Sequence, residues 1–408
     1  MTNYPRHLSS ALDRPASRGK VALIFGARQT GKSTLLRQRL LTRDVYLNLQ
    51  DIRERLQYER SPGHLTEMLL ARGPEETTVF IDEIQKVPAL LDEVQFLYDR
   101  HRGRFKFVLT GSSARKLTGT SANLLPGRAH AYRLCPLILP ERCGRRESRI
   151  LPMHTTARIP AGFPEPALEE LLLFGNLPGV ILEPDASRAL TLESYAEVYL
   201  EEEIRREALV RNVGAFQQFL ELAALESGNL VNLSSLSRQS GIAVATLRSF
   251  YQVLIDTFVG YRIPAFGERA RKRVLTTPRF LFFDTGVRNA VARLMMNHSL
   301  LQTQAGQLFE NWVGLELIHR CWYAGRPYRV SFWRTAHHAE VDFVLETPEE
   351  CVPIEVKWTV SPHETDARHL KLFLDTYPRK AQRGFIVCRC PHPLQLSKTI
   401  QAIPWWMI

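Results

Sequence analysis

The sequence predicts an α/β protein with several domains, and three observations carry this prediction. Short apolar runs at residues 21–25, 78–81 and 105–109 end in glycine, acidic or hydroxyl residues, as buried parallel strands do at a sheet edge. Amphipathic helical patterns follow after residue 160, and two further strand-like segments lie at residues 340–357. With 408 residues and 45% hydrophobic content, the chain is long enough for two or three domains with their own cores.

Residues 26–33 have the sequence GARQTGKS, which fits the pattern G-x-x-x-x-G-K-[ST]. This loop follows the first apolar run and precedes Leu35 and Leu36, so it joins a predicted strand to a predicted helix. In that setting, backbone N–H groups wrap phosphates and the helix points its positive end at them. We expect ATP to contact Gly26, Ala27, Arg28, Gln29, Thr30, Gly31, Lys32, Ser33 and Thr34. Lys32 would reach the β and γ phosphates and Ser33 would bind Mg²⁺, whereas an ordinary glycine turn with a chance lysine is the alternative.

Two acids end the apolar run at residues 78–81. Asp82 would hold the Mg²⁺ ion through Ser33 or water, and Glu83 would orient and deprotonate the attacking water. Solvated acids at a strand end are the alternative. Together with the phosphate loop, these acids predict a nucleotide hydrolase.

Two further segments supply candidate polar groups. The run 105–109 ends in Thr110-Gly111-Ser112-Ser113, where Thr110, or Ser112 as second choice, would sense the γ phosphate. Arg128 follows a Pro-Gly turn, from which it would reach the nucleotide of a neighbouring subunit. A merely solvated loop arginine is the alternative.

Four motifs in this order resemble those of prokaryotic AAA+ ATPases that carry a C-terminal domain of uncharacterised function. They are the phosphate loop, FIDEIQ at 80–85, LTGSS at 109–113 and LPGR at 125–128. The downstream half follows the same family order with YLEEE at 199–203, FFDTG at 282–286, GQLFEN at 306–311 and IEVK at 354–357. The resemblance covers nearly the whole chain and implies a homo-oligomer, with a hexameric ring as one arrangement.

Composition and charge narrow the class further. No apolar run is long enough to cross a bilayer and residues 1–10 lack the apolar core of a secretion signal, so we expect a cytoplasmic protein with reduced cysteines. Residues 100–149 hold twelve lysines and arginines against two acids, and the whole chain has a net charge of +11. Such a basic stretch favours a nucleic-acid partner, most simply DNA held through its phosphates without sequence preference. Solvated surface charge is the alternative.

The middle of the chain has the element order of a winged helix. Helical patterns at 216–227, 234–239 and 244–254 are followed by a strand at 259–263, with Gly241 at the turn. The basic run 269–273 is a better phosphate contact than the candidate recognition helix. A structural adaptor is the alternative. We expect an ATPase core at 1–160, a helical lid at 161–212, this winged-helix-like segment at 213–290 and a last domain at 291–408.

The last domain carries a second candidate chemistry. Alternation in residues 340–345 places Glu340 and Asp342 on one face of a strand and Val341, Phe343 and Leu345 on the other. The next strand ends in Glu355-Val356-Lys357, and the pair of strands resembles the core of PD-(D/E)xK nucleases, a restriction-endonuclease-like fold. The resemblance implies that Asp342, Glu355 and the Val356 carbonyl bind Mg²⁺ and that Lys357 stabilises the reacting phosphate. Glu310 matches the helix glutamate of the Holliday-junction-resolvase-like members, although Val341 stands where the named pattern has proline.

Three functions fit these patterns. The first is an oligomeric ATPase that acts on DNA and carries a Mg²⁺-dependent nuclease domain. The second is a nucleotide-gated switch whose inactive nuclease fold only grips nucleic acid, and the third is a protein-remodelling or scaffolding ATPase. The basic stretch and the acidic motif favour the first two.

Overall fold

The computed structural model describes residues 3–13, 19–112, 125–145, 150, 159–200, 213–267, 277–325 and 327–408. The chain divides into two compact units. The ATPase unit, as we name it, consists of Arg6–Cys135 with Asp256–Val259, and the C-terminal unit consists of Met1–Pro5, Pro136–Ile255 and Gly260–Ile408. The predicted α/β class is confirmed, and the division into four domains stays a prediction. Ser113, the Glu201–Glu203 run and the basic run 269–273 lie outside the described residues.

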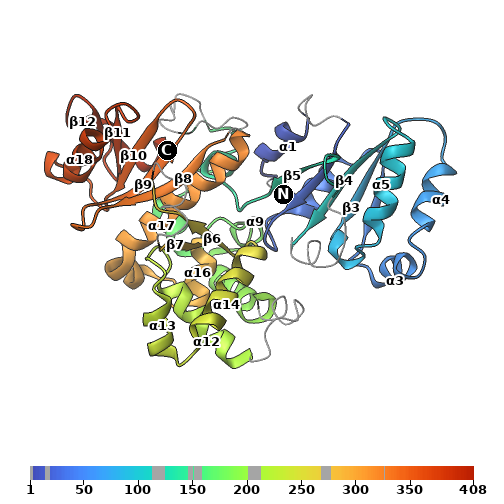
Figure 1. Cartoon of the computed structure of the whole chain (residues 1–408), viewed down its shortest axis with the longest axis horizontal. Helices are drawn as coiled ribbons and strands as arrows, with labels where there is room; N and C mark the ends of the chain where they lie inside the picture. Colours follow the sequence, from blue (N-terminus) through green and yellow to red (C-terminus); the bar gives the residue numbers. More distant parts are fainter. Residues whose placement is uncertain are drawn as a thin grey trace. The chain divides into compact units, whose positions relative to one another are not determined.

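A five-stranded parallel sheet forms the centre of the ATPase unit, in the order β2-β3-β4-β1-β5 (Figure 1). The strands are β1 (Val21–Phe25), β2 (Val45–Asn48), β3 (Thr77–Asp82), β4 (Phe105–Gly111) and β5 (Ala129–Arg133). The central strand β1 is buried along its whole length, which explains its uninterrupted apolar sequence. Because all five strands run in the same direction, their carboxyl ends share one edge.

Helices and turns connect these strands. They are α1 (His7–Leu12), α2 (Lys32–Arg39), α3 (Ile52–Arg60), α4 (His64–Leu70), the 3₁₀ turn η2 (Ile84–Lys86) and α5 (Leu90–Arg100). Helix α5 packs on β4 through an apolar stripe that repeats at helical spacing, consisting of Leu90, Leu91, Val94 and Leu97. Asp51 accepts a hydrogen bond from the backbone N–H of Arg53 at 2.7 Å and caps α3. Local sequence thus accounts for how these helices start and which side they bury.

The C-terminal unit begins with a helical region. Its elements are α7 (Leu139–Arg142), α8 (Leu168–Phe174), α9 (Pro178–Ile181), α10 (Asp185–Ser194), the π-helical turn η3 (Tyr195–Leu200), α12 (Val213–Leu225), α13 (Leu233–Ser240), α14 (Val244–Asp256), β6 (Gly260–Ile263), β7 (Arg279–Phe282) and α16 (Thr285–Val291). Strands β6 and β7 form an antiparallel pair. The helices and the first strand expected of a winged helix are present at the expected positions, and Gly241 has the positive φ of 72° that its turn requires. The lid and winged-helix assignments stay predictions.

A six-stranded mixed sheet follows, in the order β12-β13-β11-β10-β9-β8 (Figure 1). Its elements are the long helix α17 (His298–Ala324), β8 (Arg329–Arg334), β9 (Glu340–Glu346), β10 (Cys351–Val356), η4 (Glu364–Ala367), α18 (Arg368–Thr376), β11 (Gly384–Cys388), β12 (Leu394–Gln395), β13 (Ile400–Pro404) and η5 (Trp405–Met407). Both α17 and α18 pack on β9 and β10, and β10 is buried along its whole length. The central strands of this sheet are therefore enclosed.

The alternation expected along residues 340–345 is wrong at one point. The pairing of β8 with β9 shifts register between Ser331 and Trp333, which indicates a bulge in β9. As a result, Val341 and Val344 join the same apolar cluster as residues of α18, although they are three positions apart. Phe343 instead lies against Gly314 of α17, so it does not share a face with Val341.

Two global properties can be stated for the described part of the chain. None of its helices combines the length and the apolar character that a membrane crossing would need. All six cysteines are buried thiols.

The contact between α17 and the sheet generates a prediction about stability. A Cβ added at Gly314 would lie 2.6 Å from Cζ of Phe343, whereas Gly306 on the same helix has nothing within 4 Å. Alanine raises helix propensity equally at both sites, so the difference between the variants isolates the clash. We expect Gly314→Ala to be less stable than Gly306→Ala by about 1–3 kcal/mol, the usual cost of overpacking. Chemical unfolding followed by circular dichroism measures this, and equal stabilities would contradict the packing.

Candidate functional site

The phosphate loop joins β1 to α2 at the carboxyl edge of the parallel sheet. Gln29 and Gly31 have positive φ values of 61° and 92°, so the backbone turns sharply before α2 begins at Lys32. A Cβ at Gly26 would lie 2.2 Å from the carbonyl oxygen of Leu134, so only glycine fits there. The positive end of α2 therefore faces a tightly folded loop, as phosphate binding requires.

Lys32 is folded over this loop. Its ammonium group donates hydrogen bonds to the carbonyls of Gly26 and Ala27, each at 2.9 Å, and its residue is 5% exposed. The hydroxyl of Thr30 also donates to the Ala27 carbonyl at 2.9 Å. The loop thus holds its own positive charge where the sequence predicts that phosphates bind.

Asp82 ends β3, and both of its carboxylate oxygens accept hydrogen bonds. Oδ2 accepts from the hydroxyl of Tyr46 at 2.9 Å, and Oδ1 accepts from the hydroxyl of Thr110 at the end of β4. Burial, with a further contribution from Asp82, raises the pKa of Tyr46 to about 12, so its hydroxyl keeps its proton and stays a donor. Two neighbouring strands therefore orient the Asp82 carboxylate.

Glu83 is buried in a left-handed conformation, with φ 62°. Its backbone N–H donates to Oγ1 of Thr110 at 3.1 Å. Its carboxylate Oε2 accepts from the hydroxyl of Ser112 at 3.0 Å and from the side-chain amide of Gln85. The structure thus brings Thr110 and Ser112 beside the paired acids, and their role as sensors stays a prediction.

The sequence did not predict a role for three residues in this region. Tyr46 and Gln85 hold the two acids, and buried Arg6 donates to the carbonyls of Thr30 at 2.6 Å and Cys135 at 2.5 Å. Only Gln85 carries a local signal, because it lies two residues after Glu83. Arg6 and Tyr46 are far from the motifs in sequence, and only the fold brings them there.

Arg128 lies at the opposite edge of the sheet from the phosphate loop. Its carbonyl accepts a hydrogen bond from the N–H of Val21, the first residue of β1, at 2.9 Å. Its guanidinium makes a two-pronged ion pair with Asp99 of α5, at 2.8 and 2.9 Å. Arg128 therefore does not approach the phosphate loop of its own chain.

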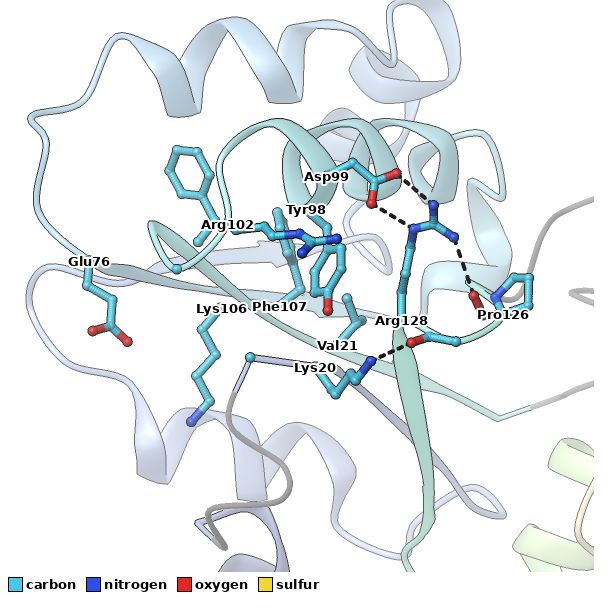
Figure 2. A pocket seen from close by; sticks show the side chains of 14 residues that line it. Lys20, Val21, Glu76, Tyr98, Asp99, Arg102, Lys106, Phe107, Pro126 and Arg128 are labelled. Carbon is cyan, nitrogen blue, oxygen red and sulfur yellow. Dashed lines mark hydrogen bonds and ion pairs between the residues drawn. The ribbon is translucent and has the colours of Figure 1, made fainter.

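An open pocket of about 860 Å³ surrounds this ion pair (Figure 2). Lys20, Arg102 and Lys106 also line it, and the ammonium group of Lys20 donates a hydrogen bond to the carbonyl of Gly127. Four of the six charged residues that line the pocket are basic, and the other two are Glu76 and Asp99. The amino edge of the sheet is thus a positively charged hollow.

The predicted acidic motif forms a cluster in the C-terminal unit. We use the name acidic cluster for Glu310 of α17, Glu340 and Asp342 of β9, and Glu355 of β10. Oδ2 of Asp342 accepts from the N–H of Val356 at 2.8 Å, and Oε1 of Glu355 accepts from Lys357 at 2.8 Å. Oε2 of Glu355 is buried and has no hydrogen-bond partner in the described structure.

Arg279, the first residue of β7, also enters this cluster. Its Nη1 atom donates to Oε1 of Glu310 at 2.7 Å and to the backbone carbonyl of Asp342 at 3.3 Å. Its Nη2 atom donates to Oε1 of Glu340. Nothing in the local sequence around Arg279 indicates this contact, since its partners are 31 to 63 residues away.

Burial governs the ionisation of the acidic cluster. Burial and the nearby charge of Asp342 raise the pKa of Glu310 to about 7 and that of Glu355 to about 8. Burial also raises the pKa of Asp342 above its usual range, against the opposing effect of Arg279. Burial would lower the pKa of Lys357, but Glu355 outweighs it and the pKa is raised. These acids need nearby positive charge to be ionised near neutral pH.

Among the residues that the structure describes, no group of three or more His, Cys, Asp or Glu side chains is arranged to hold a metal ion. The acidic cluster supplies the oxygen ligands that Mg²⁺ prefers, but Arg279 and Lys357 already occupy several of them. Oε2 of Glu355, a residue that is 6% exposed, is a buried carboxylate oxygen without a hydrogen-bond partner among the described residues. The residue types fit a divalent cation, whereas their present arrangement is closed around side-chain cations.

Comparison with protein families divides the chain into three parts. Residues 18–143 match an AAA domain, residues 165–298 match a domain of unknown function (DUF8612) and residues 305–408 match another domain of unknown function (DUF4143). The N-terminal region is therefore an AAA-type, nucleotide-binding ATPase domain. The two later matches carry no support for a nuclease-like identity.

The chain is similar along most of its length to proteins of two bacteria. An uncharacterized protein of Mycobacterium tuberculosis is 24% identical over 400 residues, which cover 98% of this chain and 83% of the relative. An uncharacterized protein of Haemophilus influenzae is 22% identical, covering 85% of each chain. Among solved structures, Drosophila ORC bound to AT-rich DNA and Cdc6 aligns with 70% of this chain and 87% of its own at 8% identity. The TM-score of this alignment is 0.21.

Proposed function

We propose that this chain is an ATP hydrolase that works as a homo-oligomer and acts on DNA. One observation carries the proposal: parallel strands bring the phosphate loop, the paired acids and Thr110 to the same edge of a sheet. This is the arrangement that phosphoryl transfer to water needs, because positioning and charge stabilisation supply most of its catalysis.

The residues divide the work as follows. Lys32 would leave the loop carbonyls to contact the β and γ phosphates, and Ser33 with Asp82 would hold Mg²⁺, which neutralises charge on those phosphates. The two hydroxyl donors on Asp82 fix the direction of its carboxylate. Glu83 would accept the proton of the attacking water once its carboxylate leaves Ser112 and Gln85.

The ATPase assignment predicts different effects for the two charged residues. Lys32→Ala should abolish tight nucleotide binding, whereas Glu83→Gln should bind ATP and lose about a hundredfold or more in turnover, since only the base is removed. Glu67→Gln on α4, whose side chain is 80% exposed, is the matched control and should change nothing. Phosphate release and fluorescent-nucleotide binding measure these effects, and unchanged turnover in Glu83→Gln would refute the role of Glu83.

The position of Arg128 supports the proposal that the chain works as an oligomer. Because it lies at the sheet edge away from its own phosphate loop, its guanidinium is free of that site and is proposed to serve the nucleotide of a neighbouring subunit. It would first have to release Asp99, and the two-pronged pair holds its side chain extended until then.

Subunit mixing tests this proposal. Arg128→Ala should lower turnover by about a thousandfold, the lower end for such arginines, while nucleotide still binds. Mixing Arg128→Ala with Lys32→Ala chains should restore part of the activity, because some interfaces then join an intact loop to an intact arginine. Asp99→Ala mixed in the same way is the control for disturbing the ion pair alone. Failure of complementation together with a monomeric mass in ATP would contradict trans action.

Action on DNA rests on the positive hollow in Figure 2. Of the basic stretch at residues 100–149, Arg102, Lys106 and Arg128 line this pocket. Arg142 is instead buried in an ion pair with Glu170, so the expectation that the whole stretch is a surface for nucleic acid is wrong at this residue. Arg115, Lys116, Arg146 and Arg149 lie outside the described residues.

Salt dependence provides the test. Arg102→Ala with Lys106→Ala should weaken binding to all DNA sequences alike and reduce the slope of log affinity against log salt by about 1.8 for duplex DNA, roughly 0.9 for each lost phosphate contact. Arg53→Ala with Arg60→Ala removes the same charge from exposed positions of α3 and should leave the slope unchanged. Equal effects of the two pairs would make net charge, and not this pocket, the cause.

A second activity is favoured by a specific observation in the C-terminal unit. The buried, unpartnered oxygen of Glu355 lies with Asp342, Glu310 and Lys357 in one cluster. We propose that Asp342 and Glu355 hold Mg²⁺, that Lys357 stabilises charge on a DNA phosphate, and that the cluster acts as a nuclease centre. If the acidic cluster is inactive and only binds nucleic acid, the protein binds DNA without cutting it. A protein-remodelling ATPase would neither bind nor cut DNA.

Cleavage assays separate these alternatives. Asp342→Asn should remove Mg²⁺-dependent cutting of branched, linear or single-stranded DNA, whereas ATP hydrolysis should stay near the wild-type rate because the phosphate loop is in another unit. Lys357→Ala should keep metal binding and lose rate. If the wild type cuts no nucleic acid in Mg²⁺ or Mn²⁺, with or without ATP, the nuclease proposal fails.

A further inference from the structure

A cationic side chain from outside the six-stranded sheet occupies the acidic cluster. Arg279 begins β7, which pairs with β6, and the residue is 6% exposed. Its guanidinium contacts the carboxylates of Glu310 and Glu340 and the carbonyl of Asp342, and it stacks on the ring of Phe332 at 5.2 Å. The arginine thus has ligands from α17 and from two positions on β9.

This arrangement is costly unless the charges match. A buried guanidinium is tolerated only where several acceptors surround it, and removing one partner leaves an uncompensated charge. Here the acceptors are the side-chain and main-chain oxygens that a hard divalent cation also prefers. Arg279 therefore places its positive charge beside Asp342, a proposed metal ligand, where it would repel such a cation.

A second observation indicates that the cluster contains a carboxylate oxygen that neither Arg279 nor Lys357 contacts. Oε2 of Glu355 is buried and has no hydrogen-bond partner among the described residues, although Oε1 of the same carboxylate contacts Lys357. Buried carboxylate oxygens are normally satisfied. Arg279 does not donate to Glu355 in this arrangement, so one ligand is present that the arginine leaves unused.

We propose that Arg279 is a built-in competitor of divalent metal: while its guanidinium holds Glu310 and Glu340, the acidic cluster is closed to the cation. Metal enters only when the start of β7 withdraws from the cluster. This inference rests on the proposed metal site at Asp342 and Glu355. It adds that the site is held in an inhibited state by a residue that belongs to the region matching a different family domain.

Metal binding tests the competition directly. Titration calorimetry with Mn²⁺ on the nucleotide-free full chain, in a Lys32→Ala background, removes the contribution of the phosphate loop. Arg279→Met should bind Mn²⁺ at least about fivefold more tightly than the parent, the lower end of usual coupling between sites. Adding Asp342→Asn should abolish the gain. Arg334→Met is the matched control, because Arg334 lies 3.9 Å from Glu340 without touching Glu310, and it should leave affinity unchanged.

A second variant tests the competition without removing Arg279, so the test does not depend on the folding of Arg279→Met. Glu340→Gln loosens one anchor of Arg279 without removing a proposed metal ligand, and it should also tighten Mn²⁺ binding. Circular dichroism verifies that each protein is folded, and Mn²⁺ should raise the melting temperature of Arg279→Met more than that of the parent. Equal Mn²⁺ affinity in the parent, Arg279→Met and Glu340→Gln would overturn the competition while leaving the metal site in place. Absence of Mn²⁺ binding in all of them would overturn both the competition and the metal site.

Discussion

Parallel pairing of β1, β3 and β4 is the constraint on which the nucleotide site depends. The register sets Phe25 beside Gly111 and Ile81 beside Leu109, so the next residues of each strand emerge at a common edge. Sequence segments that are about 30 and 55 residues apart thereby place a glycine loop, two carboxylates and a hydroxyl in contact range. Any slip of one strand by one residue would turn Asp82 or Thr110 to the other face, and the hydrogen bond between them would be lost.

Both candidate sites are filled by the chain's own donors. In the ATPase unit, Lys32 binds loop carbonyls and Glu83 is held by Gln85 and Ser112. In the C-terminal unit, Arg279 and Lys357 bind the acidic cluster. Buried polar groups must be satisfied in every state of a protein, so a site that awaits charged ligands is stable when internal partners substitute for them. Ligand binding then has to exceed these internal contacts, which makes it selective for ligands of matching charge.

The sequence was most informative where function depends on contiguous residues. The sequence predicted the positions of the phosphate loop, of Asp82-Glu83 and of Thr110. A buried parallel strand is an apolar run, and these residues directly follow or end such a run. Four features could not be predicted from the sequence. Arg6, Tyr46 and Arg279 act through partners that only tertiary structure supplies. The bulge in β9 is not marked by a glycine or proline in Glu340–Glu346. The burial of Arg142 was not predicted for the same reason, because a count of charges does not show which side chains have a buried partner.

The contacts of Glu83 bear on how hydrolysis would be controlled. A general base must face the attacking water, yet the Glu83 carboxylate accepts two hydrogen bonds that fix its direction. The positive φ of Glu83 and the hydrogen bond from its N–H to Thr110 constrain its backbone. Its side chain can still rotate about its own bonds. If Glu83 is the base, Ser112 and Gln85 hold its carboxylate in a buried position, and its release requires another acceptor that competes for their hydrogen bonds. A nucleotide whose γ phosphate attracts the Ser112 hydroxyl would provide that competition, which links ligand occupancy to the freeing of the base.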